Sequence, residues 1–331
     1  MRAVLIREFG NRGAVAVEEI DDPVLGPGEV LVDVKAAGVN FTDLLSLDGK
    51  YQNLPPLPFT PGKDASGIVA SVGDGTTLVS PGDRVIAHVN DGALAERVIA
   101  DERLCFRLPD KMNFETAAAM GLPYQTAYVA LVLRGGLKAD ERVLINGASG
   151  GVGLAAVAIA KALGATTLAG LTTPSKGEAI KQWGADAIID LTADNLRDSL
   201  RDQVMAATDN AGVDLVFDLV GGAPFDASMR AIAWSGRVVV SGFTTGTIPT
   251  VKTNYLLLKN IAVVGMAISS YFDRRAPEIA IAQAAIFDLW KEDKVHPHIM
   301  ARFPLDEFAK AIALIEDRKI VGKAVLVMDD R

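Results

Sequence analysis

The chain has 331 residues, of which 50% are hydrophobic and 22% are charged, so it is long enough for two domains with buried cores. Its formal net charge of -8 argues against a nucleic-acid partner, because binding to nucleic acid favours a basic surface. The one cysteine, Cys105, excludes an intrachain disulfide and a cysteine-rich zinc site.

The hydropathy of the sequence indicates neither export nor a membrane anchor. Residues 1–8 contain no uninterrupted apolar stretch of signal-peptide length, which favours a cytoplasmic protein. The uncharged stretch from Val143 to Ala160 is long enough to suggest a membrane span. It contains Asn146, Ser149 and four glycines, however, so a bilayer-spanning helix is the poorer interpretation.

Residues 1–122 have the pattern of a mostly β domain. Short apolar runs bounded by Gly and Pro indicate strands at 30–35, 67–73 and 82–87. Strands this short, with turns between them, predict a small barrel or sandwich. Between Glu115 and Leu133 the pattern becomes helical, with interruptions at Gly121 and Pro123.

From Arg142 onward, strands and helices alternate. The predicted strands cover 143–145, 166–171, 187–189, 214–218 and 237–241, and the predicted helices cover 154–163 and 174–183. This alternation indicates a parallel, doubly wound sheet, and helices on both faces explain why its strands are uniformly apolar. The tail from about residue 266 contains a helix and a final strand at 323–328.

The segment Gly147-Ala148-Ser149-Gly150-Gly151-Val152-Gly153 lies between a predicted strand and a predicted helix. Small residues there permit a tight turn, a close approach of the backbone to a pyrophosphate, and close packing of helix on strand. The free N–H groups and the dipole of the helix favour phosphates. Because the segment opens a βαβ unit of the required length, it predicts a dinucleotide site rather than a turn that binds nothing.

The residues after the second strand of this unit favour NADPH over NADH. NAD sites usually place an acid there to hold the ribose, whereas here Thr172 and Thr173 are followed by Pro174, Ser175 and Lys176. If Thr173 caps the next helix, Lys176 lies in its first turn, where a cation opposes the helix dipole unless an anion is near. The 2′-phosphate of NADPH is the obvious anion, and a solvated surface lysine is the alternative.

Several segments carry motifs of one family: Ala37 to Asp43, Gly49 to Tyr51, Pro58 to Gly67, Gly82 to Val85, Thr126 to Tyr128, Ala148 to Gly153, and Gly322-Lys323. Together they resemble the medium-chain dehydrogenase/reductase superfamily, specifically its zinc-free NADPH:quinone oxidoreductase (zeta-crystallin-like) branch. The resemblance implies an α/β fold in which residues 1–122 and 266–331 form a GroES-like, mostly β catalytic domain. It further implies a Rossmann dinucleotide-binding domain of residues 123–265, a cleft between the two domains, and a homodimer joined through the Rossmann sheets.

The resemblance also implies roles for individual residues. It places Asn40 and Thr126 near the nicotinamide of NADPH and Ala148, Ser149, Gly150, Gly151, Val152 and Gly153 at the pyrophosphate. It further assigns Thr172, Ser175 and Lys176 to the adenosine phosphate, Ser241, Gly242 and Phe243 to the nicotinamide ribose, and Arg318 to the cofactor. The chain departs from many relatives at Leu45, Leu47 and Leu191, and these apolar residues suggest a more hydrophobic substrate pocket.

Two further segments correspond to motifs of other dehydrogenase classes. Zinc-dependent relatives carry Gly-His-Glu where this chain has Gly62-Lys63-Asp64, and a catalytic zinc needs three Cys, His or carboxylate ligands, so we expect no metal. Tyr255 and Lys259 have the Tyr-x-x-x-Lys spacing of short-chain dehydrogenases. Those enzymes begin their Rossmann strand near the N-terminus, so we interpret the match as accidental and its three leucines as core packing.

Without a metal, hydrogen-bond donors must polarise the substrate oxygen, and the candidates are Asn40, the Tyr51 hydroxyl and the cofactor ribose. We expect hydride transfer from NADPH to a quinone or to the β-carbon of an α,β-unsaturated carbonyl, with an enoyl thioester as a variant. Tyr51 is a candidate proton donor, or else a packing residue under the loop 53–56. A non-catalytic NADPH-binding protein is the alternative of a different class.

Overall fold

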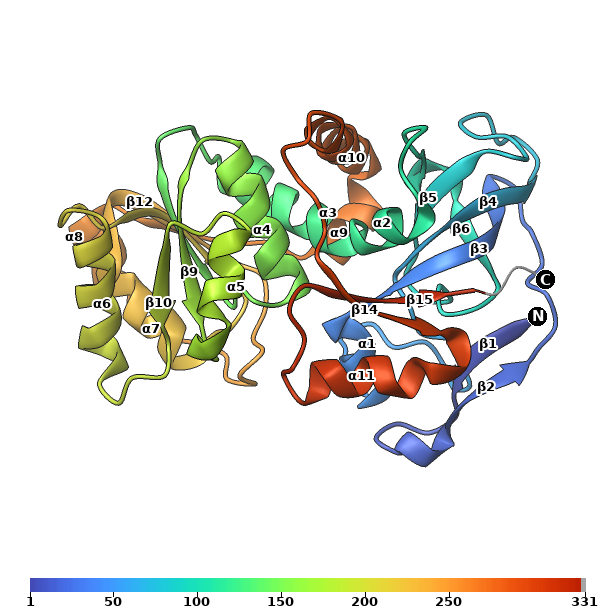
Figure 1. Ribbon diagram of the computed structural model, residues 1–331, viewed down its shortest axis with the longest axis horizontal. Helices are drawn as coiled ribbons and strands as arrows, with labels where there is room; N and C mark the ends of the chain where they lie inside the picture. The colour runs from blue at the N-terminus through green and yellow to red at the C-terminus, as the bar shows by residue number, and fades with distance from the viewer. Residues whose placement is uncertain (329–331) are drawn as a thin grey trace. The chain divides into compact units, whose positions relative to one another are not determined.

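The computed structural model describes residues 1–328 and divides the chain into two compact units (Figure 1). The first unit contains Met1–Leu122, Ser269–Phe287 and the described residues from His296 onward. The second unit contains Pro123–Ile268 and Asp288–Val295. The first unit is therefore assembled from both ends of the chain.

The second unit is built on one parallel sheet. Its strands are β8 (Arg142–Asn146), β9 (Thr166–Leu171), β10 (Ala187–Asp190), β11 (Val213–Asp218), β12 (Ile232–Val240) and β13 (Ala262–Gly265). They are ordered β10-β9-β8-β11-β12-β13, and every pair is parallel. This is the Rossmann order, in which the direction of winding reverses between β8 and β11. The predicted doubly wound sheet is confirmed, and we call this part the Rossmann unit.

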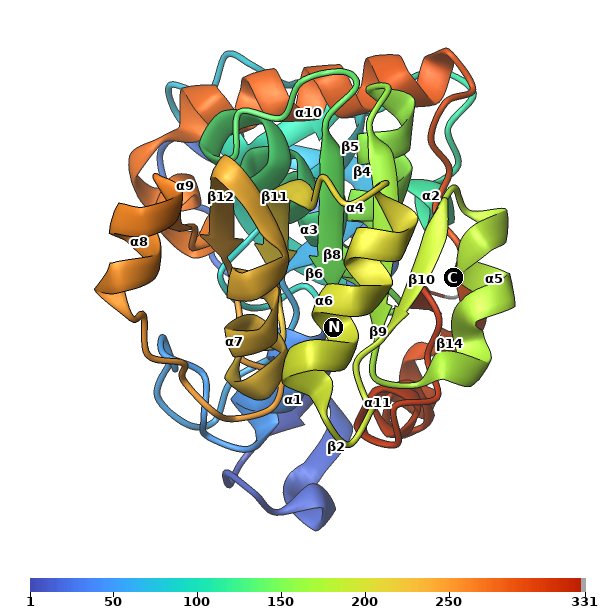
Figure 2. The ribbon, with the colours of Figure 1, turned by 90° about the vertical axis from the view of Figure 1, so that its left-hand side faces the viewer.

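Helices cover both faces of that sheet (Figures 1 and 2), with α4 on one face and α6 and α7 on the other. The helical elements are α3 (Leu122–Tyr128), a π-helix at Val129–Arg134, α4 (Gly151–Ala162), α5 (Gly177–Gln182), α6 (Leu196–Ala207), α7 (Gly222–Ala231) and α8 (Thr253–Lys259). The helix predicted at 154–163 begins earlier, because the last glycines of the turn already belong to its first turn. The helix predicted at 174–183 is split into a 3₁₀ turn at Pro174–Lys176 followed by α5.

The three leucines between Tyr255 and Lys259 correct one prediction. Leu256 packs on the Rossmann core, but Leu257 and Leu258 are 78% and 73% exposed, so they are not core residues. Lys259 Nζ donates to the carbonyl oxygens of Met229, Arg230 and Ile232, at 3.3, 2.9 and 2.9 Å. The lysine therefore satisfies the end of α7, which agrees with an accidental Tyr-x-x-x-Lys match.

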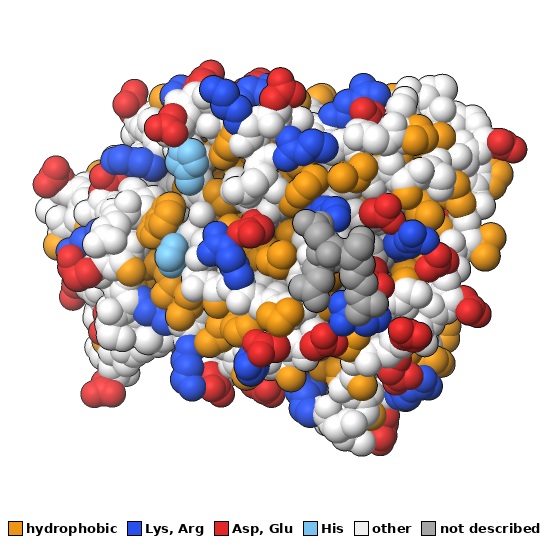
Figure 3. All heavy atoms as spheres, turned by 45° about the vertical axis from the view of Figure 1, so that its right-hand side comes forward, with side chains coloured by type: hydrophobic (Ala, Val, Ile, Leu, Met, Phe, Trp, Pro, Cys, Tyr) orange, Lys and Arg blue, Asp and Glu red, His pale blue; other side chains and the backbone are white. Residues whose placement is uncertain are grey.

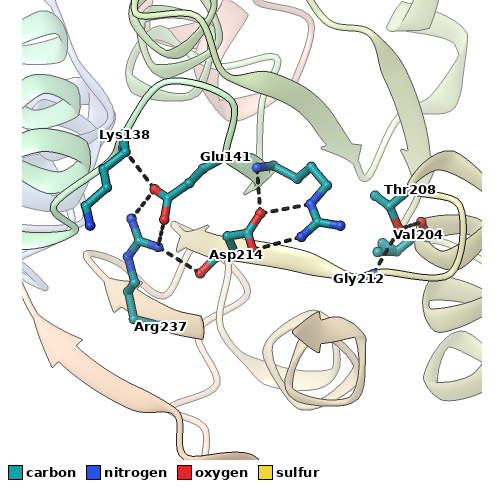
Figure 4. A network of polar contacts seen from close by, with 8 residues as sticks. Lys138, Glu141, Val204, Thr208, Gly212, Asp214 and Arg237 are labelled. Carbon is teal, nitrogen blue, oxygen red and sulfur yellow. Dashed lines mark hydrogen bonds and ion pairs between the residues drawn. The ribbon is translucent and has the colours of Figure 1, made fainter. Parts of the chain in front are cut away.

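An ion-pair network fastens the amino-terminal ends of three Rossmann strands (Figure 4). Arg142 on β8 forms a bidentate pair with the Asp214 carboxylate on β11, with both N···O distances 2.8 Å. Arg237 on β12 pairs with Glu141 at 2.7 and 2.6 Å and also donates to the Asp214 carbonyl at 3.1 Å. These contacts stabilise the sheet at the amino-terminal ends of its strands. Ligands of α/β folds bind at the opposite, carboxyl ends of the strands.

The first unit is mostly antiparallel β structure. Its strands are β1 (Arg2–Ile6), β2 (Val15–Glu19), β3 (Glu29–Val39), β4 (Asp64–Val72), β5 (Arg84–His88), β6 (Arg97–Asp101), β7 (Cys105–Arg107), β14 (Ile299–Pro304) and β15 (Lys323–Val327). The larger sheet runs β14-β15-β3-β4-β5-β7, with β6 also paired to β3, and only β14 and β15 are parallel. Strands β1 and β2 form a separate antiparallel pair.

Its helices are α1 (Phe41–Leu47), α2 (Phe114–Ala119), α9 (Ile268–Arg274), α10 (Ala276–Lys291) and α11 (Phe308–Glu316). The tail was predicted to hold one helix, but it contains three, together with the additional strand β14. Helices α9 and α11 have only seven and nine residues, so each offers a short window in which to recognise a helical pattern. Cys105 is buried at the start of β7, and burial raises the pKa of its thiol to about 12.

Two further features concern the hydropathy of the helices and the distribution of charge on the surface. Among residues 1–328, no helix is long and apolar enough to span a bilayer. On the face drawn in Figure 3, Lys and Arg side chains are interspersed with Asp and Glu rather than gathered into one basic field.

Candidate active site

The glycine-rich turn joins β8 to α4 at the switch point of the Rossmann sheet. Gly147 has a φ of +83°, and the N–H groups of Gly147 and Ala148 donate to the Gly170 carbonyl at 2.9 and 3.2 Å. A Cβ at Gly153 would lie 2.2 Å from the Gly147 carbonyl oxygen, so only glycine lets the helix pack here. A Cβ at Gly150 would meet nothing closer than 3.9 Å, which leaves that side of the turn open.

The open side faces the start of α4, whose cap residue is Gly150. Ser149, Gly151 and Val152 are each partly exposed there, and the first N–H groups of the helix have no partner within it. The turn therefore offers both space and N–H donors to a group such as a pyrophosphate. The residues present fit a dinucleotide.

A buried polar cluster lies beneath this turn, and sequence analysis missed it. The Asn146 amide donates to Asp218 Oδ1 at 2.8 Å and to Ser228 Oγ at 3.0 Å, and all three side chains are buried. Asp218 Oδ2 accepts from the Gly221 N–H at 2.9 Å. Burial raises the pKa of Asp218, although the Asn146 bond opposes that shift. An acid and an amide at the ends of neighbouring strands were the available signal.

The cluster supports the segment predicted to contact the nicotinamide ribose. Ser241 N–H donates to the Asp218 carbonyl at 2.9 Å, so the chain after β12 is tied to the end of β11. Further along, Thr244 and Thr245 N–H groups donate to the carbonyls of Leu219 and Val220, each at 3.1 Å. Ser241 and Gly242 are partly exposed and Phe243 is 40% exposed, so the segment presents its surface while its backbone is held.

Lys176 ends the 3₁₀ turn that precedes α5. Thr173 occupies the cap position as predicted, but its side chain makes no capping hydrogen bond, so that part of the expectation is wrong. Thr172 and Ser175 are exposed beside it. Burial lowers the pKa of Lys176, which indicates an ammonium partly withdrawn from water.

In the first unit, Asn40 lies at the centre of a buried chain of polar groups. Its Nδ2 donates to Asp64 Oδ1 at 2.7 Å and to the Gly38 carbonyl at 3.1 Å, and its Oδ1 accepts from Lys323 Nζ at 2.7 Å. Lys323 Nζ also donates to the Val39 carbonyl at 2.7 Å. Since both N–H bonds of the amide are used within the protein, Asn40 has no donor left for a substrate oxygen.

Two aspartates complete this buried group. Asp43 accepts from the backbone N–H groups of Asn40 and Gly62 at 2.7 and 3.2 Å, and burial raises its pKa to about 6. Asp64 Oδ2 accepts from the Leu122 N–H at 2.9 Å. Burial lowers the pKa of Lys323, while the charges of Asp64 and Asp43 work in the opposite direction. In this group the Lys323 ammonium lies near the carboxylates of Asp43 and Asp64, and such pairing offsets the unfavourable burial of charge.

Tyr51 is partly buried at the end of the segment that follows α1. The Ser269 side chain lies near its hydroxyl, and Lys63 Nζ lies 4.7 Å from its ring centroid. Burial is the main reason that the pKa of Tyr51 is raised, and the charges of Asp43 and Asp91 act in the same direction. The phenol therefore stays protonated near neutral pH and can donate a hydrogen bond.

The other predicted residues differ in how far they are buried. Thr126 is buried in α3, and Arg318 follows α11 with a φ of +55° and an exposed side chain. Leu47 and Leu191 are buried in the cores of their own units, and of the three departures only Leu45 is partly exposed. A more hydrophobic substrate pocket therefore stays a prediction.

Comparison with known proteins agrees with this architecture. Residues 26–110 match the family described as the alcohol dehydrogenase GroES-like domain, and residues 151–285 match the family described as zinc-binding dehydrogenase. The chain is 35% identical to mouse quinone oxidoreductase-like protein 2 over 98% of this chain and 91% of the relative. It is 32% identical to human quinone oxidoreductase over 99% of this chain and 98% of the relative.

Solved structures give the same result. The structure of mycobacterial Rv1454c complexed with NADPH superposes with a TM-score of 0.91, at 31% identity, covering 99% of this chain and 100% of the other. Escherichia coli quinone oxidoreductase complexed with NADPH superposes with a TM-score of 0.89, at 27% identity, over the same shares of the two chains. With a GroES-like unit, a Rossmann unit and relatives of this identity over its whole length, the chain belongs to the quinone oxidoreductase branch of the medium-chain dehydrogenase/reductase superfamily.

Proposed function

We propose that this oxidoreductase binds NADPH and, without a metal, reduces a quinone or an α,β-unsaturated carbonyl compound. The observation that carries the proposal is the protonated, partly buried Tyr51 phenol in a chain whose Rossmann turn fits a dinucleotide pyrophosphate. The NADPH complexes of Rv1454c and of Escherichia coli quinone oxidoreductase support the choice of cofactor. Human quinone oxidoreductase supports the choice of substrate class.

In this proposal, residues 148–153 hold the pyrophosphate and Ser241, Gly242 and Phe243 support the nicotinamide ribose. Thr172, Ser175 and Lys176 would bind the 2′-phosphate, and Lys176 would be the residue that distinguishes NADPH from NADH. Asn40, Thr126 and Arg318 are proposed as further cofactor contacts. When bound, the cofactor supplies the hydride, and the protein supplies orientation and electrostatics.

The residues of the chain itself act on the substrate oxygen. As negative charge develops there, a preorganised donor stabilises it, and the protonated Tyr51 hydroxyl is the proposed donor. Asn40, whose amide hydrogens are already donated, is proposed as a positioning residue that joins β3 at Gly38 to β4 at Asp64. We therefore propose that residues 1–122 and 266–331 form the catalytic domain. Residues 123–265 then form the cofactor-binding domain.

The proposal excludes a catalytic metal on the chemistry of the residues present. Lys63 stands where zinc-dependent relatives carry a histidine ligand, and its ammonium is committed to Asp91 and the Asn90 carbonyl. Within residues 1–328, no three His, Cys, Asp or Glu side chains are grouped so as to hold a metal ion. Activity that survives dialysis against a chelator would support the proposal, whereas stoichiometric zinc in elemental analysis would contradict it.

We also propose a homodimer joined through the Rossmann sheets. The exposed apolar side chains of Trp234, Ile248, Leu257 and Leu258 are 72, 74, 78 and 73% exposed and belong to β12, the following loop and α8. These elements adjoin β13, the strand at one end of the sheet order. An apolar surface beside an edge strand is suited to pairing with a second copy of the chain.

One experiment tests the function. Oxidation of NADPH is followed with a panel of a benzoquinone, a naphthoquinone, an alkenal, a cyclic enone and an enoyl thioester. Turnover with a quinone or an enone supports the proposal, and turnover with the thioester alone favours an enoyl-thioester reductase. NADPH binding without turnover on any of them would indicate a non-catalytic NADPH-binding protein.

A further inference from the structure

Lys63 is a buried cation whose surroundings the reaction described above does not use. Its side chain is 7% exposed, and it immediately precedes β4. Nζ donates to the Asn90 carbonyl and to Asp91 Oδ1, the latter at 3.2 Å, and lies 4.7 Å from the centroid of the Tyr51 ring. An ammonium has three N–H donors, so two are bonded and the cation also faces an aromatic ring.

Burial of this ammonium needs a reason beyond the ion pair. A lysine that only paired with Asp91 could do so at the surface, because that carboxylate is partly exposed, and it would then keep its hydration. Removing a cation from water is unfavourable unless several groups replace the lost water. Here the replacement includes the face of Tyr51, and a desolvated cation–π contact is among the stronger ones.

We propose that Lys63 is a positioning residue for Tyr51, holding its ring in place and strengthening its hydroxyl as a hydrogen-bond donor. This inference rests on the proposed function, in which Tyr51 donates to the substrate oxygen. A positive charge over the ring stabilises electron density that shifts toward the ring when the O–H bond is polarised. Lys63 never touches the substrate and acts only through Tyr51.

The geometry also explains why the contact is rigid. Lys63 joins the start of β4 to the loop at Asn90 and Asp91, while the backbone N–H of Tyr51 donates to the Leu45 carbonyl at 3.2 Å. The Ser269 side chain lies near the hydroxyl. Tyr51 is thus held at its backbone and at its ring face by different elements of the same unit.

The test compares Lys63→Met, Lys63→Gln and Lys63→Arg with Lys50→Met as a matched control. Lys50 is the exposed neighbour of Tyr51 in sequence and pairs with Asp48 at 3.1 Å. We expect Lys63→Met and Lys63→Gln to lower kcat on the best electrophile about tenfold, the size of a desolvated cation–π contact, with an unchanged NADPH dissociation constant. Lys63→Arg should recover most of the rate, and Lys50→Met should match the wild type.

A double-mutant cycle separates positioning from general damage to the fold. If Lys63 acts through Tyr51, adding Lys63→Gln to Tyr51→Phe should change kcat less than twofold, because the hydroxyl is already absent. Equal losses in both backgrounds would overturn the proposal, and so would a Lys63→Gln enzyme with wild-type kcat.

A second readout does not need turnover. Alkaline titration of tyrosine absorbance, with Tyr51→Phe as the reference that identifies Tyr51, should show its ionisation at higher pH in Lys63→Gln than in the wild type. An identical titration would overturn the inference even if no electrophile is found. Failure of the proposed function, by contrast, would appear as a wild-type protein without turnover and with the titration shift intact.

Discussion

Asn40 Nδ2 lies 2.7 Å from Asp64 Oδ1 among buried side chains, and Oδ1 of the same amide accepts a hydrogen bond from Lys323 Nζ. The amide therefore joins a buried carboxylate to a buried ammonium that come from opposite ends of the chain. Asn40 closes a structural bridge, and this has direct consequences for stability.

Replacement of Asn40 by alanine should destabilise the protein by about 1–3 kcal/mol, the cost of leaving buried polar groups without a partner. The free energy of unfolding of the cofactor-free protein in urea measures this effect. Asn53→Ala, at an exposed asparagine of the following loop, is the control and should be neutral. Equal stability of the two variants would show that Lys323 and Asp64 can pair without the amide.

Replacement of Tyr51 by phenylalanine should lower kcat by about 10²–10³ where water cannot substitute for the lost donor. The dissociation constant of NADPH, measured by fluorescence, should stay the same, because the contact is made mainly in the transition state. An unchanged kcat would assign proton delivery to solvent or to the cofactor ribose.

Replacement of Lys176 by alanine should raise the KM for NADPH and leave that for NADH nearly untouched. A charged contact to a phosphate is worth about 1.5–3 kcal/mol, which corresponds to a roughly ten- to hundredfold preference. Lys181→Ala is the matched control, since Lys181 lies on α5 and pairs with Glu178 at 2.9 Å. Equal losses with both cofactors would mean that Lys176 supports the fold rather than the phosphate.

His88 should make the protein less stable as the pH falls. It is fully buried, stacks on Phe272 at 5.3 Å between ring centroids, and its Nε2 lies 3.3 Å from Gln283 Oε1. Burial lowers its pKa below the ordinary value of 6.5, so the unfolded chain binds a proton more readily than the folded one. Stability from this group is thus complete above pH 6.5 and is lost below it, by at most about 1.4 kcal/mol per pH unit.

The variant His88→Phe keeps a ring for stacking and removes the titration, so its unfolding free energy should fall less steeply with decreasing pH. Asp43 contributes with the opposite sign, because its pKa of about 6 lies above the usual 3.8 and protonation favours the folded state. That contribution is common to both proteins and cancels in the comparison. Parallel pH profiles would contradict the assignment to His88.

The double substitution Leu257→Glu and Leu258→Glu should convert the proposed dimer into a monomer in sedimentation velocity. Charges on an apolar contact surface are left without solvation when the copies associate. Ile281→Glu is the control, because Ile281 is 61% exposed on α10 in the other unit. A wild-type protein that sediments as a monomer would remove the basis of the dimer proposal.

Local patterns predicted the elements of the Rossmann unit well, because strands such as β9 are bounded by turn residues and the glycine turn has a fixed chemistry. They failed at α8, where three consecutive leucines indicate burial but not which of them faces the core. A pattern of seven residues is too short to predict which side of such a helix faces the core.

The polar contacts of the candidate site were beyond sequence reasoning for a different reason. Lys323 and Asn40 are separated by 283 residues, and Asn146 and Asp218 by 72, so no local spacing relates them. Asn40 could be proposed from its motif, but its partners decide whether its amide is available, and only the three-dimensional arrangement supplies them. The same holds for Lys63, because its proposed role depends on the groups that it contacts in the folded chain.

Cys105 has a practical consequence. The only cysteine of the chain is buried, and a thiol whose pKa is about 12 has almost no thiolate at the pH of maleimide labelling. The wild-type sequence is therefore a silent background for fluorescent or spin probes attached to a newly introduced cysteine. A cysteine at Ile281, which is 61% exposed and outside the proposed contact surface, would carry a single label per chain, and energy transfer between labels would report on the distance between two copies.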